Sequence, residues 1–340
     1  MKLEERVFHV LMGIAYGDSL GMPSESMTPK QISKNFGYIN SLLPNKKDPL
    51  LPNNERNLLA GQVTDDTANS IFITKMLINF NGKINKKDYV QSLIHWLDTD
   101  DTAASVSGPS TMIAVNAIKK GVAIEKAGIR GTTNGASMKI GPMGLVYDYH
   151  EEENLVKAVA EVCVPTHNTQ IAIQGAAIVA TLVSYFFRNF QIDWEVYFKL
   201  VERAALIAKN YGNKLPSPDI MKRIMYGKKI SDELSESDFQ DELYGFLGTG
   251  LDTIQMVPAA VSLVYRYKGD LKHCALVAAN IGGDTDTLAS ICGAICGGYN
   301  FNIDEQDIRT IQKVNNIDFV GLSKSIARLL EKKSFIDTDR

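Results

Sequence analysis

The chain has 340 residues, of which 45% are hydrophobic and 22% charged, and its formal net charge is -3. This composition is typical of a globular protein that can bury a full core. Because the net charge is slightly negative, no overall positive field attracts a nucleic acid or an anionic membrane, so local groups must meet any anionic substrate. We therefore expect no nucleic acid and no membrane among its partners.

Two segments bear on targeting and membrane insertion. Residues 1–18 contain Glu4 and Glu5 and lack an apolar run with a cleavage site, so they do not predict a signal peptide. The most apolar stretch, 171–187, is borderline for a membrane span of about 17–25 residues, and polar side chains interrupt it, which favours a buried central helix. The four cysteines show no disulfide framework, and we expect a reducing, cytoplasmic location.

Most of the chain repeats its apolar residues at helical spacing, beginning with Val7, Val10, Leu11 and Ile14. The same spacing recurs in 71–80, 87–97, 151–163, 167–187, 195–209, 255–267, 271–280, 286–298 and 305–315. Runs that alternate with period two are almost absent, so the fold is predicted to be all-α. Segments rich in Gly, Pro or Asn predict long loops at 37–61, 128–147 and 210–218. The middle one is long enough to indicate a functional loop.

The first predicted helix ends in the sequence GIAYGDSLGMPSE. Gly13, Gly17 and Gly21 recur every four residues, so a helix here has one bare face for close packing. Asp18 and Glu25 add carboxylates around its end. Taken alone, this pattern favours a packing contact between helices, with two solvated acids beside it.

Two acidic clusters stand where predicted helices begin: TDDT at 64–67 and GGDTDT at 282–287. Helix capping explains one carboxylate per helix, because a side-chain oxygen accepts from the free amides and the helix dipole favours negative charge. Adjacent carboxylates beside hydroxyls are instead what Mg²⁺ or Mn²⁺ requires, since these cations take oxygen ligands. Zinc is disfavoured because neither cluster contains His or Cys. Metal binding is favoured over double capping.

Small residues also line the helix that follows the second cluster. Ala289, Gly293 and Gly297 lie at i, i+4 and i+8. If this face packs against the glycine face of the first helix, the two backbones approach closely and the distant acidic turns meet. We therefore expect one domain over 1–340, although the length alone would suggest about two.

At this point the sequence resembles a known family. The segments GIAYGDSLGMPSE, TDDT and GGDTDTLASICGAICGG, in this order and spacing, are similar to the ADP-ribosylglycohydrolase family, from about residue 5 to 300. TTNGASMKIGPMG (132–144) and VPTHNTQIAIQGAAIVA (164–180) resemble its substrate loop and central helix. The resemblance implies a single-domain orthogonal helical bundle and two Mg²⁺ or Mn²⁺ ions. It also implies hydrolysis of the bond between the anomeric carbon of ADP-ribose and a protein side chain or small leaving group.

The resemblance also assigns residues to roles. The metal ligands that it implies are Thr64, Asp65, Asp66, Asp284, Asp286 and Thr287. The loop residues that it places against ribose and phosphate are Asn134, Gly135, Ser137 and Met138. Glu25 matches an acid near the metals, and either Glu25 or a metal-bound aspartate such as Asp65 is expected to take the proton of the attacking water. His167 has a family counterpart and is expected either to face the site or to cap the next helix.

Two positions depart from the pattern of many relatives. Val106 stands where relatives that act on modified arginine carry an aspartate, and Lys139 stands where arginine is frequent. The first departure weakens the expectation of arginine-linked ADP-ribose. Two alternatives therefore remain beside an ADP-ribosyl hydrolase: a hydrolase of a smaller N- or O-ribosyl compound, and a non-catalytic relative similar to some lens crystallins.

Overall fold

The structure is a computed structural model that describes residues 1–51, 53 and 55–338, with side chains up to residue 332. Within these residues the secondary structure is helical, with three isolated β-bridges and no strand. The α-helices are α1 (Leu3–Gly21), α2 (Pro29–Phe36), α3 (Asp65–Asn79), α4 (Lys86–Thr99), α5 (Ala103–Val106), α6 (Pro109–Lys119), α7 (Ile124–Ala127), α8 (Gly141–Val146), α9 (Glu152–His167), α10 (Gln170–Arg188), α11 (Trp194–Ala208), α12 (Ile220–Glu233), α13 (Glu236–Glu242), α14 (Thr253–Arg266), α15 (Leu271–Ile281), α16 (Thr285–Gly297), α17 (Glu305–Asn315) and α18 (Phe319–Thr338). Short 3-10 turns lie at Met22–Ser24 and Asn134–Ala136, and a π-turn lies at Leu243–Leu247. The predicted all-α class is confirmed.

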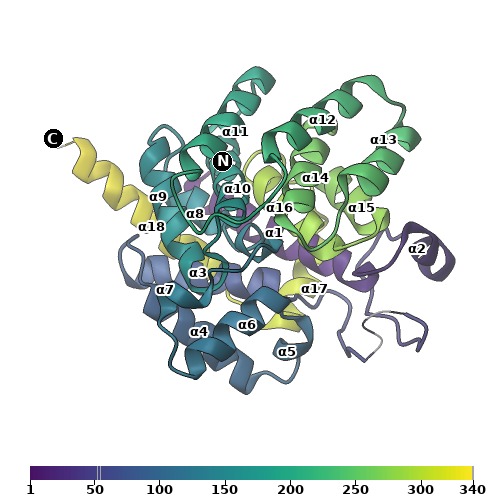
Figure 1. Ribbon diagram of the computed structural model, residues 1–340, viewed down its shortest axis with the longest axis horizontal. Coiled ribbons are helices and arrows are strands. Elements are labelled where there is room, and N and C mark those ends of the chain that lie inside the picture. The colour runs from purple at the N-terminus through teal and green to yellow at the C-terminus, as the bar shows by residue number, and fades with distance from the viewer. Residues whose placement is uncertain (52, 54, 339–340) are drawn as a thin grey trace.

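Helices α1 and α16 form the centre of the bundle and pack backbone to backbone (Figure 1). A Cβ added to Gly17 would lie 2.1 Å from the Ala289 carbonyl oxygen, and one added to Gly21 would lie 2.3 Å from that of Thr285. No side chain larger than hydrogen fits at these glycines without separating the helices. The small faces predicted from the sequence therefore do pack together, and they bring the ends of both helices to one place.

Helix α10 is the buried central helix. It is the one helix in the described chain that is long and apolar enough to cross a membrane, and 94% of its 18-residue apolar window is buried inside the protein. Its neighbours in space include α8, α9, α11, α14 and α16. Such burial explains its composition, because a helix covered on every side is apolar on every side.

The remaining helices surround this centre. Figure 1 shows α4, α5, α6 and α7 together at the lower part of the molecule, and α12, α13, α14 and α15 at the upper right. The described hydrophobic core runs as one contiguous cluster from Val7 on α1 to Leu329 on α18. A small separate cluster of Met22, Leu58 and Val106 packs with Trp96 on α4.

The predicted loops are partly confirmed. No helix interrupts 37–61 or 210–218 within the described residues, but 128–147 contains the Asn134–Ala136 turn and helix α8. The prediction of a continuous irregular loop over 128–147 is therefore wrong. Helix α8 is entirely buried, and its sequence GPMGLV is too short and too rich in glycine and proline to show a helical period.

Candidate active site

The first acidic cluster opens α3, and a residue from another helix caps it. Thr64 is the N-cap residue, yet its side chain makes no capping hydrogen bond. Instead, the buried carboxylate of Asp18 on α1 accepts from the Thr64 amide at 3.0 Å and the Thr67 amide at 3.1 Å. It also accepts from the Thr64 hydroxyl at 2.8 Å and the Thr67 hydroxyl at 2.5 Å. The expectation of a solvated Asp18 was wrong.

This capping by Asp18 leaves the acids of α3 free for another role. Asp66 is buried, its Oδ1 has no hydrogen-bond partner among the described residues, and its Oδ2 accepts from Thr287 Oγ1 at 3.2 Å. Asp65 Oδ2 accepts from the Gly108 amide at 3.2 Å. An unpartnered buried carboxylate oxygen is costly unless a cation or a proton neutralises it.

The second cluster opens α16 after a turn that only glycines form readily. Gly282 and Gly283 have φ angles of 88° and 86°, in the left-handed region. The Asp284 amide then donates to the Thr249 carbonyl at 2.7 Å, and the Asp284 carboxylate accepts from Asn134 Nδ2 at 2.5 Å. Asp284 is the N-cap residue but makes no side-chain capping bond. Its carboxylate is directed toward the substrate loop instead.

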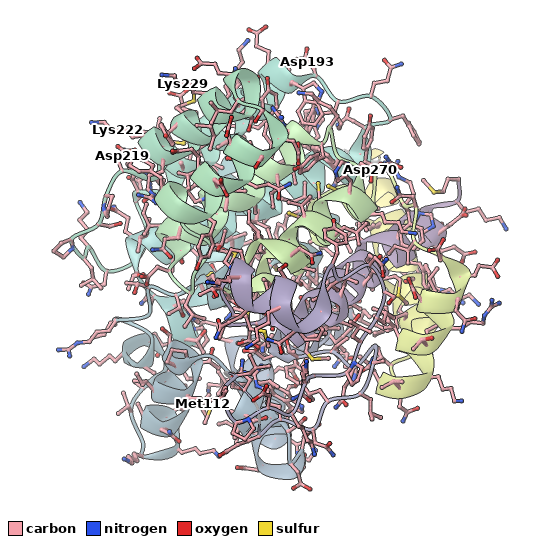
Figure 2. The ribbon with its side chains drawn as sticks, turned by 90° about the vertical axis from the view of Figure 1, so that its right-hand side faces the viewer. Met112, Asp193, Asp219, Lys222, Lys229 and Asp270 are labelled. Carbon is pink, nitrogen blue, oxygen red and sulfur yellow. The ribbon has the colours of Figure 1, made fainter. Side chains whose placement is uncertain are left out.

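Ordinary capping in this protein follows a different pattern. Asp193, Asp219 and Asp270 are the N-cap residues of α11, α12 and α15, and each accepts from amides of its own helix. Figure 2 shows all three at the surface of the molecule. The acids of α3 and α16 are buried instead, and among the described residues only Asp286 accepts from an amide of its own helix, that of the adjacent Thr287 at 3.0 Å, so double capping does not explain the two clusters.

The two clusters meet at Asp286. Oxygen atoms of Asp66, Asp286 and Asp18 lie within 4.8 Å of one another, and so do oxygen atoms of Asp286, Asp284 and Glu25. Asp286 therefore belongs to both groups. Asp18 is already saturated by the donors of α3, so we regard it as a support for the first group rather than a ligand.

Crowding and burial change the acidity of these groups. Burial, followed by the charges of neighbouring acids, raises the pKa of Asp66 well above its ordinary value, and burial with the charge of Asp284 does the same for Asp286. Burial is also the main cause that raises the pKa of Asp65 to about 7 and that of Asp284 to about 6. The protein accommodates these acids only if protons or cations balance their charge.

The donor set fits divalent cations that prefer oxygen. Around Asp286 it consists of carboxylates and the Thr287 and Thr64 hydroxyls, with no histidine or thiol in either acidic group. Mg²⁺ and Mn²⁺ select such ligands, and two groups that share one carboxylate match a two-metal arrangement. The unpartnered Oδ1 of Asp66 is the atom for which a cation would supply the missing partner.

The loop at 132–144, called the substrate loop from its sequence resemblance, borders this acidic centre. The Asn134 amide donates to the Leu251 carbonyl at 2.8 Å, which fixes the loop beside the start of α14. Asn134, Gly135 and Met138 line the cleft. Ser137 lies elsewhere: its buried Oγ has no partner among the described residues and it is not part of the cleft lining. A direct contact of the Ser137 side chain with substrate is therefore not supported.

Glu25 lines the cleft and forms an ion pair with a residue that the sequence did not predict as its partner. Arg56, from the long 37–61 loop, forms an ion pair with Glu25 by donating from both terminal nitrogens, Nη1 and Nη2, and its Nε donates to the Ser105 carbonyl at 2.9 Å. Burial, with the charge of Asp286, raises the pKa of Glu25 to about 8 although Arg56 opposes the rise. Glu25 is 13% exposed and is therefore not a solvated acid either.

His167 occupies neither of its two predicted positions. It is fully buried and does not line the cleft, and Thr169 rather than His167 caps α10. It lies behind the substrate loop, where a Cβ added to Gly135 would be 2.8 Å from its Cε1. Its Nε2 is 2.9 Å from the hydroxyl of Thr133, which does line the cleft. The sequence alone does not show which residues a buried side chain contacts.

The cleft itself has a volume of about 140 Å³, which is smaller than the roughly 300–1,000 Å³ typical of sites for drug-sized ligands. Its acidic floor consists of Asp65, Asp284, Asp286 and Thr287. Thr64 and Asp66 are buried next to this floor rather than exposed in it. Residues of the cleft that sequence reasoning did not select are Arg56, Ser107, Gly108, Pro109, Thr111, Thr133 and Leu251.

Comparison with known proteins identifies the class to which this all-α bundle with its acidic cleft belongs. The sequence pattern of the family described as ADP-ribosylglycohydrolase matches residues 1–306. The chain therefore belongs to the ADP-ribosylglycohydrolase family, which is a family of hydrolases.

Individual relatives match over nearly the whole length. The uncharacterized protein YegU of Escherichia coli (strain K12) is 30% identical over 340 residues, which cover 98% of this chain and 99% of that protein. The ADP-ribosylhydrolase ARH3 of Homo sapiens is 22% identical over 345 residues, covering 95% and 93%. A solved structure, the ADP-ribosylglycohydrolase-related protein complex, superposes with a TM-score of 0.67 at 19% identity, covering 96% and 98%.

Proposed function

We propose that this protein is a divalent-metal-dependent hydrolase that cleaves the glycosidic bond at the anomeric carbon of ADP-ribose. The observation that carries the proposal is that Asp286 joins two acidic groups below a loop of small residues. Family membership and the name of the human relative, an ADP-ribosylhydrolase, support the same substrate class.

Each cluster has a defined part in this proposal. The residues that would hold two Mg²⁺ or Mn²⁺ ions are Thr64, Asp65, Asp66, Asp284, Asp286 and Thr287. When bound, the ions would supply Lewis acidity and orient the sugar hydroxyls. Asn134 holds Asp284 in place through its amide, and the Asn134–Met138 loop would bind ribose and phosphate through its backbone amides.

Glu25 is the residue we assign to proton transfer, with Asp65 as the second candidate. Glycoside hydrolysis requires a base for the attacking water and an acid for the leaving group. Arg56 favours the ionised form of Glu25, while burial and the charge of Asp286 favour the protonated form. Neutralising Asp286 would therefore shift Glu25 toward the carboxylate, which is the form that accepts the proton of water.

The leaving group is a separate question, for which Val106 is informative. Val106 lines the cleft and packs with Met22 and Leu58, so this wall is apolar. An apolar wall offers no carboxylate to a guanidinium, which disfavours arginine-linked ADP-ribose and keeps a smaller N- or O-ribosyl compound as the second candidate. A non-catalytic relative is disfavoured, because buried like charges destabilise a fold that does not use them.

The deciding experiment is a hydrolysis screen over arginine-, serine- and acetyl-linked ADP-ribose and simple ribosides, each with EDTA, Mg²⁺ or Mn²⁺. We expect metal-dependent release of ADP-ribose from at least one linkage other than arginine. Hydrolysis of ribosides alone would select the second candidate. Full activity in EDTA would contradict the metal-dependent mechanism.

Two further properties belong to the proposal. The contiguous core and the site built from α1, α3 and α16 support a single domain over 1–340. The four cysteines, all free and buried, support a reducing compartment such as the cytoplasm. The partner we propose is an ADP-ribosylated substrate, with no role for nucleic acid or membrane.

A further inference from the structure

A line of hydrogen bonds runs behind the substrate loop and ends at the cleft. Lys139 Nζ is 3.1 Å from the Tyr89 hydroxyl and 2.8 Å from Thr166 Oγ1. Thr166 Oγ1 is 2.8 Å from His167 Nδ1, and His167 Nε2 is 2.9 Å from Thr133 Oγ1. Four of these residues are buried, and only Thr133 lines the cleft. The line therefore has one buried end and one end that a ligand can reach.

The buried end is a lysine without a carboxylate. Lys139 is 1% exposed and forms no ion pair within the part of the chain that the structure describes. Its partners are hydroxyls and the face of the Tyr89 ring, 4.8 Å from Nζ. Burial lowers the pKa of Lys139 to about 8, so most molecules carry the ammonium at pH 7. A buried ammonium must donate to every acceptor within reach.

The partners of Lys139 are oriented accordingly. Tyr89 donates its own hydrogen to Asn69 Oδ1 at 2.7 Å, and the Asn69 amide nitrogen donates to the Asp65 carbonyl at 2.8 Å. The Tyr89 oxygen is thus available to accept from Lys139. Thr166 likewise accepts from Lys139, because an ammonium has no lone pair to offer.

The direction of the remaining bonds follows. With its oxygen accepting from Lys139, Thr166 can donate its hydroxyl hydrogen to His167 Nδ1. His167 is neutral, since burial and then the charge of Lys139 lower its pKa well below the ordinary value. A neutral imidazole that accepts at Nδ1 carries its hydrogen on Nε2 and donates it to Thr133. Thr133 then accepts from His167 and has its hydroxyl hydrogen free for the cleft.

We propose that Thr133 binds substrate as a hydrogen-bond donor, and that Lys139, Thr166 and His167 are positioning residues that fix this direction. The acceptor would be an oxygen of the ligand, either on the diphosphate or on the ribose of ADP-ribose. The choice of ADP-ribose rests on the proposed function. The direction of the hydrogen bonds does not, because it is a property of the ligand-free protein.

The first test measures that direction without any ligand. In ¹⁵N-histidine-labelled protein at pH 7, His167 is expected to show the Nε2–H tautomer, and the loss of this signal in His167→Gln assigns it. In Lys139→Met, the Nε2–H population should fall because the Thr166 hydroxyl is released, whereas Lys139→Arg should restore it. Lys313→Met, on an exposed position of α17, is the matched control. If Lys139→Met does not fold, Thr166→Val is the alternative, because it removes the hydroxyl that contacts His167 Nδ1.

An Nδ1–H tautomer or a charged His167 in the native protein would overturn the proposal. So would an unchanged Nε2–H population in both Lys139→Met and Thr166→Val. These outcomes concern only the direction of the hydrogen bonds from Lys139 to Thr133. They remain readable if the native protein proves not to bind ADP-ribose, a result that would contradict the proposed ligand and leave the hydrogen-bond direction supported.

The second test measures binding by calorimetry, with ADP-ribose, ADP and ribose as probes. Thr133→Val keeps the shape of the side chain and removes the hydroxyl, so ADP-ribose should bind about 10-fold more weakly, the loss expected for one hydrogen bond to a charged or polar group. Thr133→Ser should recover the lost affinity, and Thr99→Val at the exposed end of α4 is the control. An equal loss for ADP assigns the bond to the diphosphate, and a loss for ADP-ribose alone assigns it to the ribose. No loss with either ligand would overturn the proposal.

Discussion

The carboxylate of Asp18 on α1 caps helix α3 across 46 residues of sequence, with both of its oxygens 3.0 Å from the Thr64 amide. One buried acid thus satisfies the first turn of the helix that carries Asp65 and Asp66. The relationship separates two kinds of acid in the site. Asp18 is saturated by donors from the protein itself, whereas Asp66 retains an oxygen without a partner among the described residues.

Asp18→Asn should therefore destabilise the protein even without metal. An amide in this place turns a donor toward other donors, so the capping of α3 is lost in part, and the free energy of unfolding should fall by about 2 kcal/mol. Urea denaturation in EDTA measures this change. Asp219→Asn, at the exposed N-cap of α12, is the control and should be nearly neutral, because asparagine caps helices as well as aspartate does. Equal effects of the two substitutions would contradict the special role of Asp18.

Asp286→Asn should have the opposite pattern. Removing one of several crowded charges leaves the metal-free stability unchanged or raised, while hydrolysis is abolished and Mg²⁺ or Mn²⁺ stabilises the variant less than the native protein. Thermal melts with EDTA and with each metal measure the three effects. The same metal-induced rise in melting temperature for both proteins would exclude Asp286 as a ligand.

The stability of the metal-free protein should decrease as pH rises. Burial raises the pKa values of Asp284, Asp65 and Glu25 to about 6, 7 and 8, so between the ordinary carboxyl pKa of about 4 and pH 8 the folded state holds more protons than the unfolded state. The stabilising contribution of these three groups is then fully present below about pH 4 and is lost as pH rises through their folded-state pKa values toward pH 8. Bound divalent ions replace these protons, so added metal should restore stability mainly at the higher pH. Urea midpoints at pH 5, 6.5 and 8, with and without metal, provide the measurement, and a metal-free midpoint that rises over this range would be contrary to expectation.

Gly135→Val should weaken ADP-ribose binding and leave metal binding nearly intact. A Cβ at this position would lie 2.8 Å from Cε1 of the buried His167 behind the loop, so the loop must shift away from His167 and into the cleft. Calorimetric titration with ADP-ribose and, separately, with Mn²⁺ distinguishes the two effects. Gly245→Val is the control, because no atom lies within 4 Å of a Cβ added there. Unchanged ADP-ribose affinity in the Gly135 variant would remove this loop from the substrate site.

Much of the architecture is encoded locally and could be predicted. The helical period of apolar residues predicts α1, α3, α9, α10 and most later helices, because each must bury one face. The glycine spacing in α1 and the small residues of α16 predict the close contact that brings the acidic turns together. The expected metal ligands and substrate loop came from the resemblance of short, distinctive motifs to a family, and not from the helical period.

The tertiary structure decided which atoms meet. Asp18 and Asp66 are both acids near a helix end, and only the positions of their donors, contributed by separate elements, make one a cap and leave the other unpartnered. The pairing of Arg56 with Glu25 and the location of His167 behind Thr133 depend in the same way on contacts between segments distant in sequence. A periodic pattern specifies that a face is buried but not what covers it. Residue type and spacing therefore determined the helices and the acidic turns of this protein, and packing determined the partner, and hence the role, of each polar side chain.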